Sequence, residues 1–207
     1  MTNRIIPTAV INPDAPPESL EAKQPAIDNG AEIYGKSGYF SHEQVEQEWQ
    51  KIWTDSWLIA GVSTDLPNVG DYFLFKVRSE SLIITKTTEG IKAFYNVCPH
   101  RGARLVTEER GNKKVFVCPF HSWSFHNNGD LRSITDEDTF QEAVICHRPG
   151  LTAAACQEHA GLIFISMADQ PPALADVIGL PEGYLENYHI DKMRVVRHVR
   201  SEWGSNW

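Results

Sequence analysis

The feature that most constrains this chain is a pair of Cys-Pro stretches, CPHRG at Cys98–Gly102 and CPFHSW at Cys118–Trp123. Each stretch offers one thiolate and one imidazole within a few residues, and these are metal-binding groups. The segments AFYNV and KVFV that lead into them are typical of β-strands. The sequence therefore predicts two loops at the tips of hairpins, which face each other across a metal site.

The ligand spacing is Cys98-x-His100, seventeen intervening residues, and then Cys118-x-x-His121. Two cysteines and two histidines suit tetrahedral zinc, but zinc fingers usually bring the cysteines as one close pair and the histidines as another. Mixed pairs on two loops match a Rieske 2Fe–2S centre, where cysteines bind one iron and histidines the other. We predict this centre, with zinc or a chance coincidence as the alternatives.

Composition excludes several classes of protein. The formal net charge of −8 leaves no basic surface for nucleic acid. No apolar run is long enough to cross a membrane. Prolines interrupt the N-terminus where a signal peptide would have its apolar core, so we expect a cytoplasmic protein with reduced thiols. Cys146 and Cys156 lack partner ligands at useful spacing, and each is expected to have only a packing role, in the core or at the surface.

The pattern along the chain predicts four regions. Residues 1–38 are proline-rich and are expected to form a mobile N-terminal arm. Residues 39–56 show helical spacing of apolar residues, with Ser41 as the N-cap, and predict one amphipathic helix. Residues 57–168 predict the metal-binding β domain, and residues 169–207 a linker followed by the first strand of an absent catalytic domain.

Short segments rich in aromatic and β-branched residues predict a mainly β fold, an antiparallel sandwich or barrel. Turn signals separate them at Pro67-Asn68, Glu89-Gly90 and Gly111-Asn112, and Asn128-Gly129 predicts a further hairpin. The expected strands are WLIAGV (57–62), DYFLFKV (71–77), SLIITKT (81–87), IKAFYNV (91–97), KKVFVC (113–118) and GLIFIS (161–166).

The stretches FYNVCPHRGARL, VCPFHSWSFHNNGDLRSI and GLIFIS resemble the Rieske domain of Rieske non-haem iron oxygenases. These are the large, or alpha, subunits of aromatic-ring-hydroxylating dioxygenases and related enzymes. The resemblance runs from about Tyr39 to Trp207. It implies an antiparallel multi-sheet Rieske sandwich with two cluster-binding hairpin loops, preceded by the helix and the arm.

The resemblance also implies ligand roles. Cys98 and Cys118 would bind the buried iron, and His100 and His121 the outer iron. One departure is Ser122, because the family commonly has glycine after the second histidine. Trp123 and Phe125 are expected to pack under the cluster and shield it from water.

The resemblance places the catalytic, mononuclear non-haem Fe(II) in a domain that follows, so no catalytic residue is expected here. Asn206-Trp207 would lie just before its ligands. The segment LENYHIDKM is similar to the family's iron-binding segment, but Glu186, His189 and Asp191 lack the required spacing and are expected in a solvated turn. The remaining histidines are expected to be structural or at the surface, namely His42, His126, His147 and His159.

By resemblance, the chain is the electron-relay part of an oxygenase that hydroxylates an aromatic or related organic substrate with O2, as in aromatic hydrocarbon catabolism. A ferredoxin or flavin reductase would supply electrons, and the complete protein would form a homotrimer. The acidic stretch TDEDTFQE could help to dock a basic donor, although a solvated loop is the simpler interpretation. A free-standing Rieske ferredoxin-type carrier and a zinc-stabilised interaction domain are the alternatives.

The sequence predicts a low reduction potential. High-potential Rieske proteins add a cysteine to each loop and supply serine and tyrosine hydroxyls, whereas the corresponding places here hold Ala103, Phe120, Trp123 and Phe125. Fewer hydrogen bonds to the sulfurs favour the oxidised state. We therefore expect a midpoint potential of about −150 mV. A redox titration measures it, and a clearly positive value would contradict the prediction.

Overall fold

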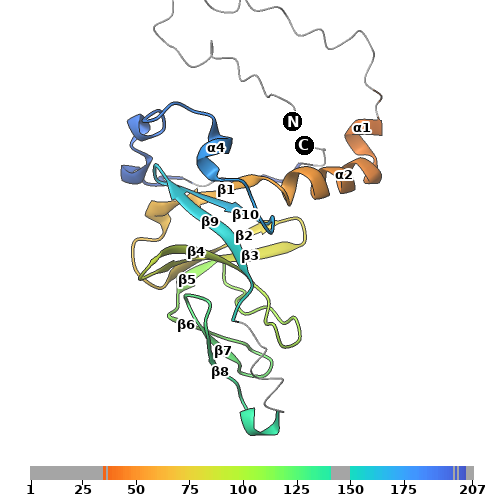
Figure 1. Cartoon of the computed structure of the whole chain (residues 1–207), viewed down its shortest axis with the longest axis vertical. Helices are drawn as coiled ribbons and strands as arrows, with labels where there is room; N and C mark the ends of the chain where they lie inside the picture. Colours follow the sequence, from red (N-terminus) through yellow and green to blue (C-terminus); the bar gives the residue numbers. More distant parts are fainter. Residues whose placement is uncertain (1–34, 36, 141–149, 198, 200, 204–207) are drawn as a thin grey trace, which may run out of the picture.

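The computed structural model describes residues 35, 37–140, 150–197, 199 and 201–203. Its main element is a seven-stranded antiparallel sheet with strand order β1-β10-β9-β4-β3-β2-β5 (Figure 1). The mainly β, antiparallel fold class predicted from the sequence is therefore confirmed. The strands are β1 (Trp57–Val62), β2 (Asp71–Val77), β3 (Glu80–Thr87), β4 (Gly90–Tyr95), β5 (Arg110–Asn112), β9 (Ala153–His159) and β10 (Leu162–Ser166).

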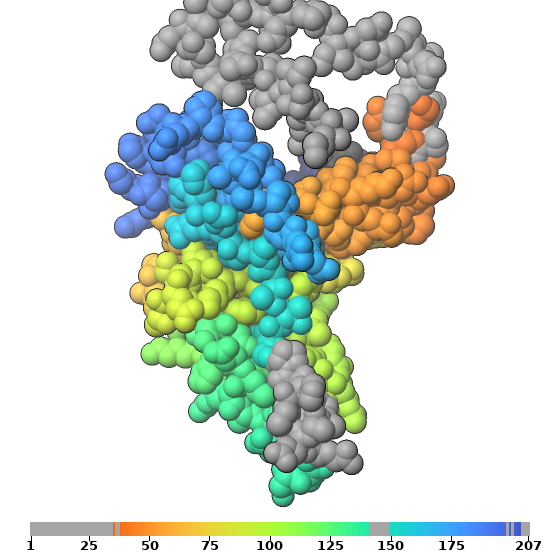
Figure 2. Space-filling model, viewed as in Figure 1, coloured from red at the N-terminus to blue at the C-terminus, as the bar shows by residue number. Residues whose placement is uncertain are grey.

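A second, three-stranded sheet carries one of the two Cys-Pro stretches. Its strands are β6 (Val115–Val117), β7 (Ser124–His126) and β8 (Leu131–Ser133), in the order β6-β7-β8. The β7–β8 hairpin turns at the predicted Asn128-Gly129 pair. Figure 1 shows this small sheet (green) at one end of the molecule, away from β1, and the same green region lies at that end in Figure 2.

Short helices precede the large sheet. The predicted cap is confirmed, because the Gln44 backbone N–H donates to Ser41 Oγ at 3.1 Å. The predicted single helix is instead α1 (Ser37–Phe40), α2 (His42–Glu48) and a π-helical turn, η3 (Trp49–Trp53). A π turn inserts a residue into the helical repeat, and Ile52 of the predicted apolar stripe is 52% exposed. The other helices are η4 (Ser63–Asp65), η5 (Glu137–Thr139), α4 (Leu174–Ile178), η6 (Glu186–Tyr188) and η7 (Ile190–Lys192).

Strand β3 separates two hydrophobic cores, since successive side chains of a strand point to opposite faces. Ile83 packs into a core that also contains Cys98 and Cys118. Leu82 and Ile84 pack into a second core, on the other face, together with residues of β10. Because both faces of β3 are covered, its sequence is an apolar run rather than an alternating one. The first core supports the Cys-Pro loops from beneath.

Two strands were not expected from the sequence. The Gly111-Asn112 pair, predicted as a turn, lies in β5, where Gly111 pairs with Tyr72 and Asn112 with Asp71. Strand β9 has the sequence AAACQEH, whose alanines and polar residues have little β propensity. It forms because β10 pairs with it along one edge and β4 along the other. Pairing with neighbouring strands overrides local propensity in both cases.

Several predicted features remain predictions. The N-terminal arm falls almost entirely outside the described residues, as does Cys146. The described residues from Met193 onward contain no strand, and His198, Arg200 and 204–207 lie outside the described part. None of the helices in the described part has the length and apolarity needed to cross a membrane.

A buried asparagine ties the first Cys-Pro loop to the large sheet. Asn96 is 1% exposed. Its Oδ1 accepts hydrogen bonds from the backbone N–H groups of Leu105 and Val106, each at 3.0 Å. Its Nδ2 donates to the Val106 carbonyl at 2.8 Å and to Ser81 Oγ at 3.3 Å. The side chain therefore satisfies backbone groups on the far side of the loop that begins at Cys98.

We expect Asn96→Ala to lower the free energy of unfolding by about 3 kcal/mol, because it leaves buried polar groups without partners. Urea unfolding followed by circular dichroism measures the change. Asn68→Ala is the matched control, since the Asn68 amide bonds Asp71 at the surface; its loss is expected to be about 0.5–1 kcal/mol. Equal losses of stability in the two variants would contradict the structural role given to Asn96.

Candidate metal centre

The two Cys-Pro stretches fold into the same six-residue turn. In the first, the Cys98 N–H donates to the Ala103 carbonyl at 2.8 Å and the Gly102 N–H donates to the Cys98 carbonyl at 2.9 Å. In the second, the Cys118 N–H donates to the Trp123 carbonyl at 2.8 Å and the Ser122 N–H to the Cys118 carbonyl at 3.0 Å. The cysteine is the first residue of each turn, so both thiols begin from equivalent backbone positions.

The fifth residue of each turn has a left-handed backbone. Gly102 has φ +73° and Ser122 has φ +59°. A left-handed φ is free of strain for glycine and unfavourable for a residue with a Cβ atom. The turn therefore explains why glycine suits this position, and the Ser122 departure keeps the same backbone at the expense of strain.

The turns bring the predicted ligands together in two layers. Cys98 and Cys118 are 1% and 2% exposed and lie in one hydrophobic core, with their thiols in hydrogen-bonding contact. His100 and His121 are half-buried, with ring centroids 4.6 Å apart. The thiols are thus innermost and the imidazoles lie nearer the surface, as the predicted inner and outer ligand roles require.

The environment of Cys98 opposes its ionisation while no metal is present. Burial raises the pKa of the Cys98 thiol, and the neighbouring Cys118 sulfur raises it further. The backbone N–H groups of His100 and Arg101 act in the opposite direction, because they donate hydrogen bonds to the Cys98 sulfur. Such N–H donors stabilise a thiolate and would tune the charge on an iron-bound sulfur. The pocket thus suits a thiolate whose charge a metal compensates.

A buried imidazole nitrogen also fits a metal. His121 Nδ1 is buried and makes no hydrogen bond to the described residues, and a buried polar atom of this kind needs a partner. Two thiols paired in the core and two imidazoles paired nearer the surface are the donor set of a cluster in which thiolates bind one iron and imidazoles the other.

Aromatic rings surround the two histidines. Trp123, which is 1% exposed, stacks on His100 with a centroid separation of 4.7 Å and an interplanar angle of 6°. The ring of Phe120, which is 60% exposed, lies next to that of His121, with a centroid separation of 3.9 Å. The Phe140 ring is nearly perpendicular to the His100 ring, with a centroid separation of 6.2 Å. A cleft of about 240 Å³ opens beside them, lined by His100, His121, Ser122, Thr135, Asp136 and Phe140 among others. Sequence reasoning found Trp123 but no signal for Phe140.

In the segment LENYHIDKM, the side chain of Glu186 lies beside a histidine of strand β9. Glu186 Oε1 lies 3.6 Å from Nε2 of His159, which ties η6 to the end of β9. Neither His189 nor Asp191 joins them in a metal-binding group among the described residues. His42 and His126 are exposed at the surface, and His147 lies outside the described residues.

Cys156 belongs to the core packing and not to the metal centre. It is half-buried in β9 and packs against the second hydrophobic core. Burial raises the pKa of its thiol to about 12, with Glu158 adding to the shift. The thiol therefore stays protonated at neutral pH and is a poor nucleophile or ligand.

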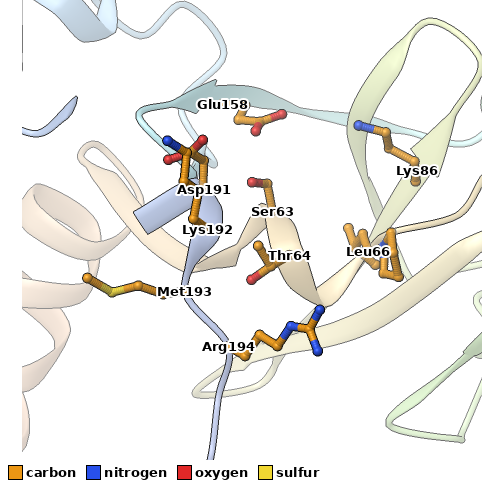
Figure 3. Close-up of a pocket in the computed structure, with 10 residues that line it drawn as sticks. Ser63, Thr64, Leu66, Lys86, Glu158, Asp191, Lys192, Met193 and Arg194 are labelled. Carbon is orange, nitrogen blue, oxygen red and sulfur yellow. The ribbon is translucent and has the colours of Figure 1, made fainter. Parts of the chain in front are cut away.

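A larger cavity of about 620 Å³ lies elsewhere (Figure 3). The turn Ser63–Leu66 forms one wall, and η7 with the residues up to Arg194 forms another. Its charged lining residues are Lys86, Glu158, Asp191, Lys192 and Arg194, of both signs. None of the residues that line it belongs to either Cys-Pro turn, so it plays no part in the candidate centre.

Comparison with known proteins agrees with this geometry. The family described as the Rieske [2Fe-2S] domain matches residues 56–147. The chain is 32% identical over 161 residues to the glycine betaine monooxygenase oxygenase subunit of Chromohalobacter salexigens, covering 77% of this chain and 36% of that protein. It is 34% identical over 157 residues to the large oxygenase component of the naphthalene 1,2-dioxygenase system of Pseudomonas fluorescens, covering 74% and 34%.

A solved structure shares the fold. The quaternary ammonium Rieske monooxygenase in complex with L-carnitine superposes with a TM-score of 0.65 at 29% identity, covering 75% of this chain and 43% of that one. The family match and the fold thus identify a Rieske [2Fe–2S] domain at residues 56–147. The chain matches the N-terminal, Rieske-bearing portion of Rieske oxygenase large subunits, and it spans less than half the length of these relatives.

The left-handed position of the two turns generates a paired prediction. Ser122→Gly removes backbone strain but adds flexibility to the unfolded chain, and we expect a net stabilisation of about 0.5 kcal/mol. Gly102→Ala introduces the strain, and we expect a loss of about 0.5–1 kcal/mol. A Cβ atom at Gly102 meets nothing within 4 Å, so backbone conformation alone determines that effect. Urea unfolding of both variants measures the signs, and a more stable Gly102→Ala variant would contradict them.

Proposed function

We propose that this chain is the electron-relay part of an oxygenase component and that Cys98, His100, Cys118 and His121 hold its [2Fe–2S] cluster. A bound cluster would supply reversible one-electron transfer. The observation that carries the proposal is the layered placement of these side chains on two equivalent turns, with contacting thiols in the core and contacting imidazoles near the surface.

The cysteines and the histidines would have different roles in electron transfer. Cys98 and Cys118 would anchor the inner iron in a core that excludes water. His100 and His121, beside the open cleft, would bind the outer iron, where electrons enter and leave. Because imidazole is a neutral ligand, the histidines leave less negative charge on the cluster than four thiolates would. An electron is therefore accepted more readily.

The proposed oxygenase would use a mononuclear non-haem iron in a further domain to hydroxylate an organic substrate with O2. The oxygenase subunits among the relatives support this role.

The partners follow from the same role. We propose a ferredoxin or flavin reductase as the electron donor, a homotrimeric complete protein, and a cytoplasmic setting in which the thiols stay reduced. The net charge of −8 disfavours nucleic acid as a partner. The relatives named above act on glycine betaine, naphthalene or carnitine, so the substrate here is proposed only as an organic compound.

Purified protein tests the proposal directly. We expect two iron and two sulfide ions per chain and the electron paramagnetic resonance (EPR) spectrum of a reduced Rieske cluster. Cys98→Ser and His121→Ala are expected to lose the cluster. Cys156→Ser, which alters a thiol of the second core, is the matched control and should retain it. One zinc ion per chain, or a cluster that survives Cys98→Ser, would overturn the proposal.

A further inference from the structure

The two histidines of the centre are supported by their neighbours in different ways. The His100 ring lies parallel to the indole of Trp123, with a 6° angle between their planes. Trp123 belongs to the second turn and His100 to the first, so this contact joins the two turns. The ring of Phe140 meets the edge of His100 at 6.2 Å and that of Trp123 at 5.9 Å. His100 is therefore held by a buried aromatic cluster.

His121 has a looser neighbour. The Phe120 ring contacts it at 3.9 Å but is tilted by 36° and is 60% exposed. An exposed ring can change rotamer without displacing other side chains, whereas the 1% exposed Trp123 ring is fixed by the core around it. The two imidazoles therefore differ in how firmly their ring planes are held.

We propose that Trp123 is the positioning residue for His100. A ligand nitrogen donates through a lone pair that lies in the plane of the imidazole ring, so the ring plane must contain the metal. A parallel indole resists tilting of the imidazole out of that plane and excludes water from one of its faces. This role rests on the proposed function, because it assigns the orientation of one ligand of the proposed cluster.

Pulsed EPR of the reduced protein tests this role, because it resolves the nitrogen couplings of the two histidine ligands. Trp123→Leu removes the stacking ring, and we expect one coupling to change while the other is retained. Phe120→Leu should change neither coupling, because the exposed Phe120 ring does not fix the plane of the His121 ring. Iron release to a chelator should be on the order of tenfold faster in Trp123→Leu, as expected for the loss of an aromatic pair. Trp123→Phe keeps a ring and should stay within about twofold of the wild type.

Phe116→Leu is the matched control for loosening of the core. Phe116 is buried in the same core, and the replacement also exchanges an aromatic ring for leucine. Both couplings should be retained in this variant. If Trp123→Leu does not fold, as judged by circular dichroism, Trp123→Met removes the ring with an unbranched side chain that adapts more readily to the space left. A folded variant without a ring at position 123 that binds no cluster supports the role when Phe116→Leu retains its cluster.

Wild-type couplings in a ringless Trp123 variant would overturn the positioning role. So would equal changes in both couplings, or changes in Trp123→Leu that Phe116→Leu reproduces. A wild-type protein without the spectrum of a Rieske cluster would instead overturn the proposed function itself. The two failures are therefore distinguishable.

Discussion

The contact between two buried thiols is the constraint on which the rest of the structure depends. Cys98 and Cys118 lie side by side in the core, where ionisation is unfavourable without a compensating charge. Two separate turns must meet to create this contact, and neither turn is regular secondary structure. The left-handed residue at position five allows each turn to close by hydrogen bonds between its own backbone groups. The large sheet and the small sheet then supply the fixed ends from which the turns start.

The large sheet also controls where the first turn lies. Strand β4 ends at Tyr95, and the next residue, Asn96, uses its side-chain amide to bond the backbone of Leu105 and Val106. The segment between these points contains Cys98 and His100 and forms no strand pairing. The buried Asn96 side chain therefore links the two ends of this segment, where a hairpin would use hydrogen bonds between paired strands. This is why the turn can present its ligands without the backbone groups at its base remaining unsatisfied.

The sequence was sufficient to predict the parts of the fold that depend on local patterns. The apolar run of β3 and the Asn128-Gly129 hairpin carry their own signals, and so do the four proposed ligands. Strands β5 and β9 were missed because pairing with neighbours, and not composition, makes them strands. The hydrogen bonds of Asn96 and the packing of the Phe140 ring on His100 are contacts between residues that are separated in the sequence. No periodicity or motif in a single sequence records such contacts.

The turns share a backbone but differ in where they place the histidine. His100 is the third residue of its turn, whereas His121 is the fourth, and Phe120 stands third in the second turn. This difference of one position within the turn explains why the two imidazoles have different surroundings. The sixth residue of the second turn, Trp123, reaches across to the histidine of the first. The equivalent residue of the first turn is Ala103, whose methyl group is too short to reciprocate. An asymmetric centre thus arises from two nearly equivalent turns through side-chain choice at positions three and six.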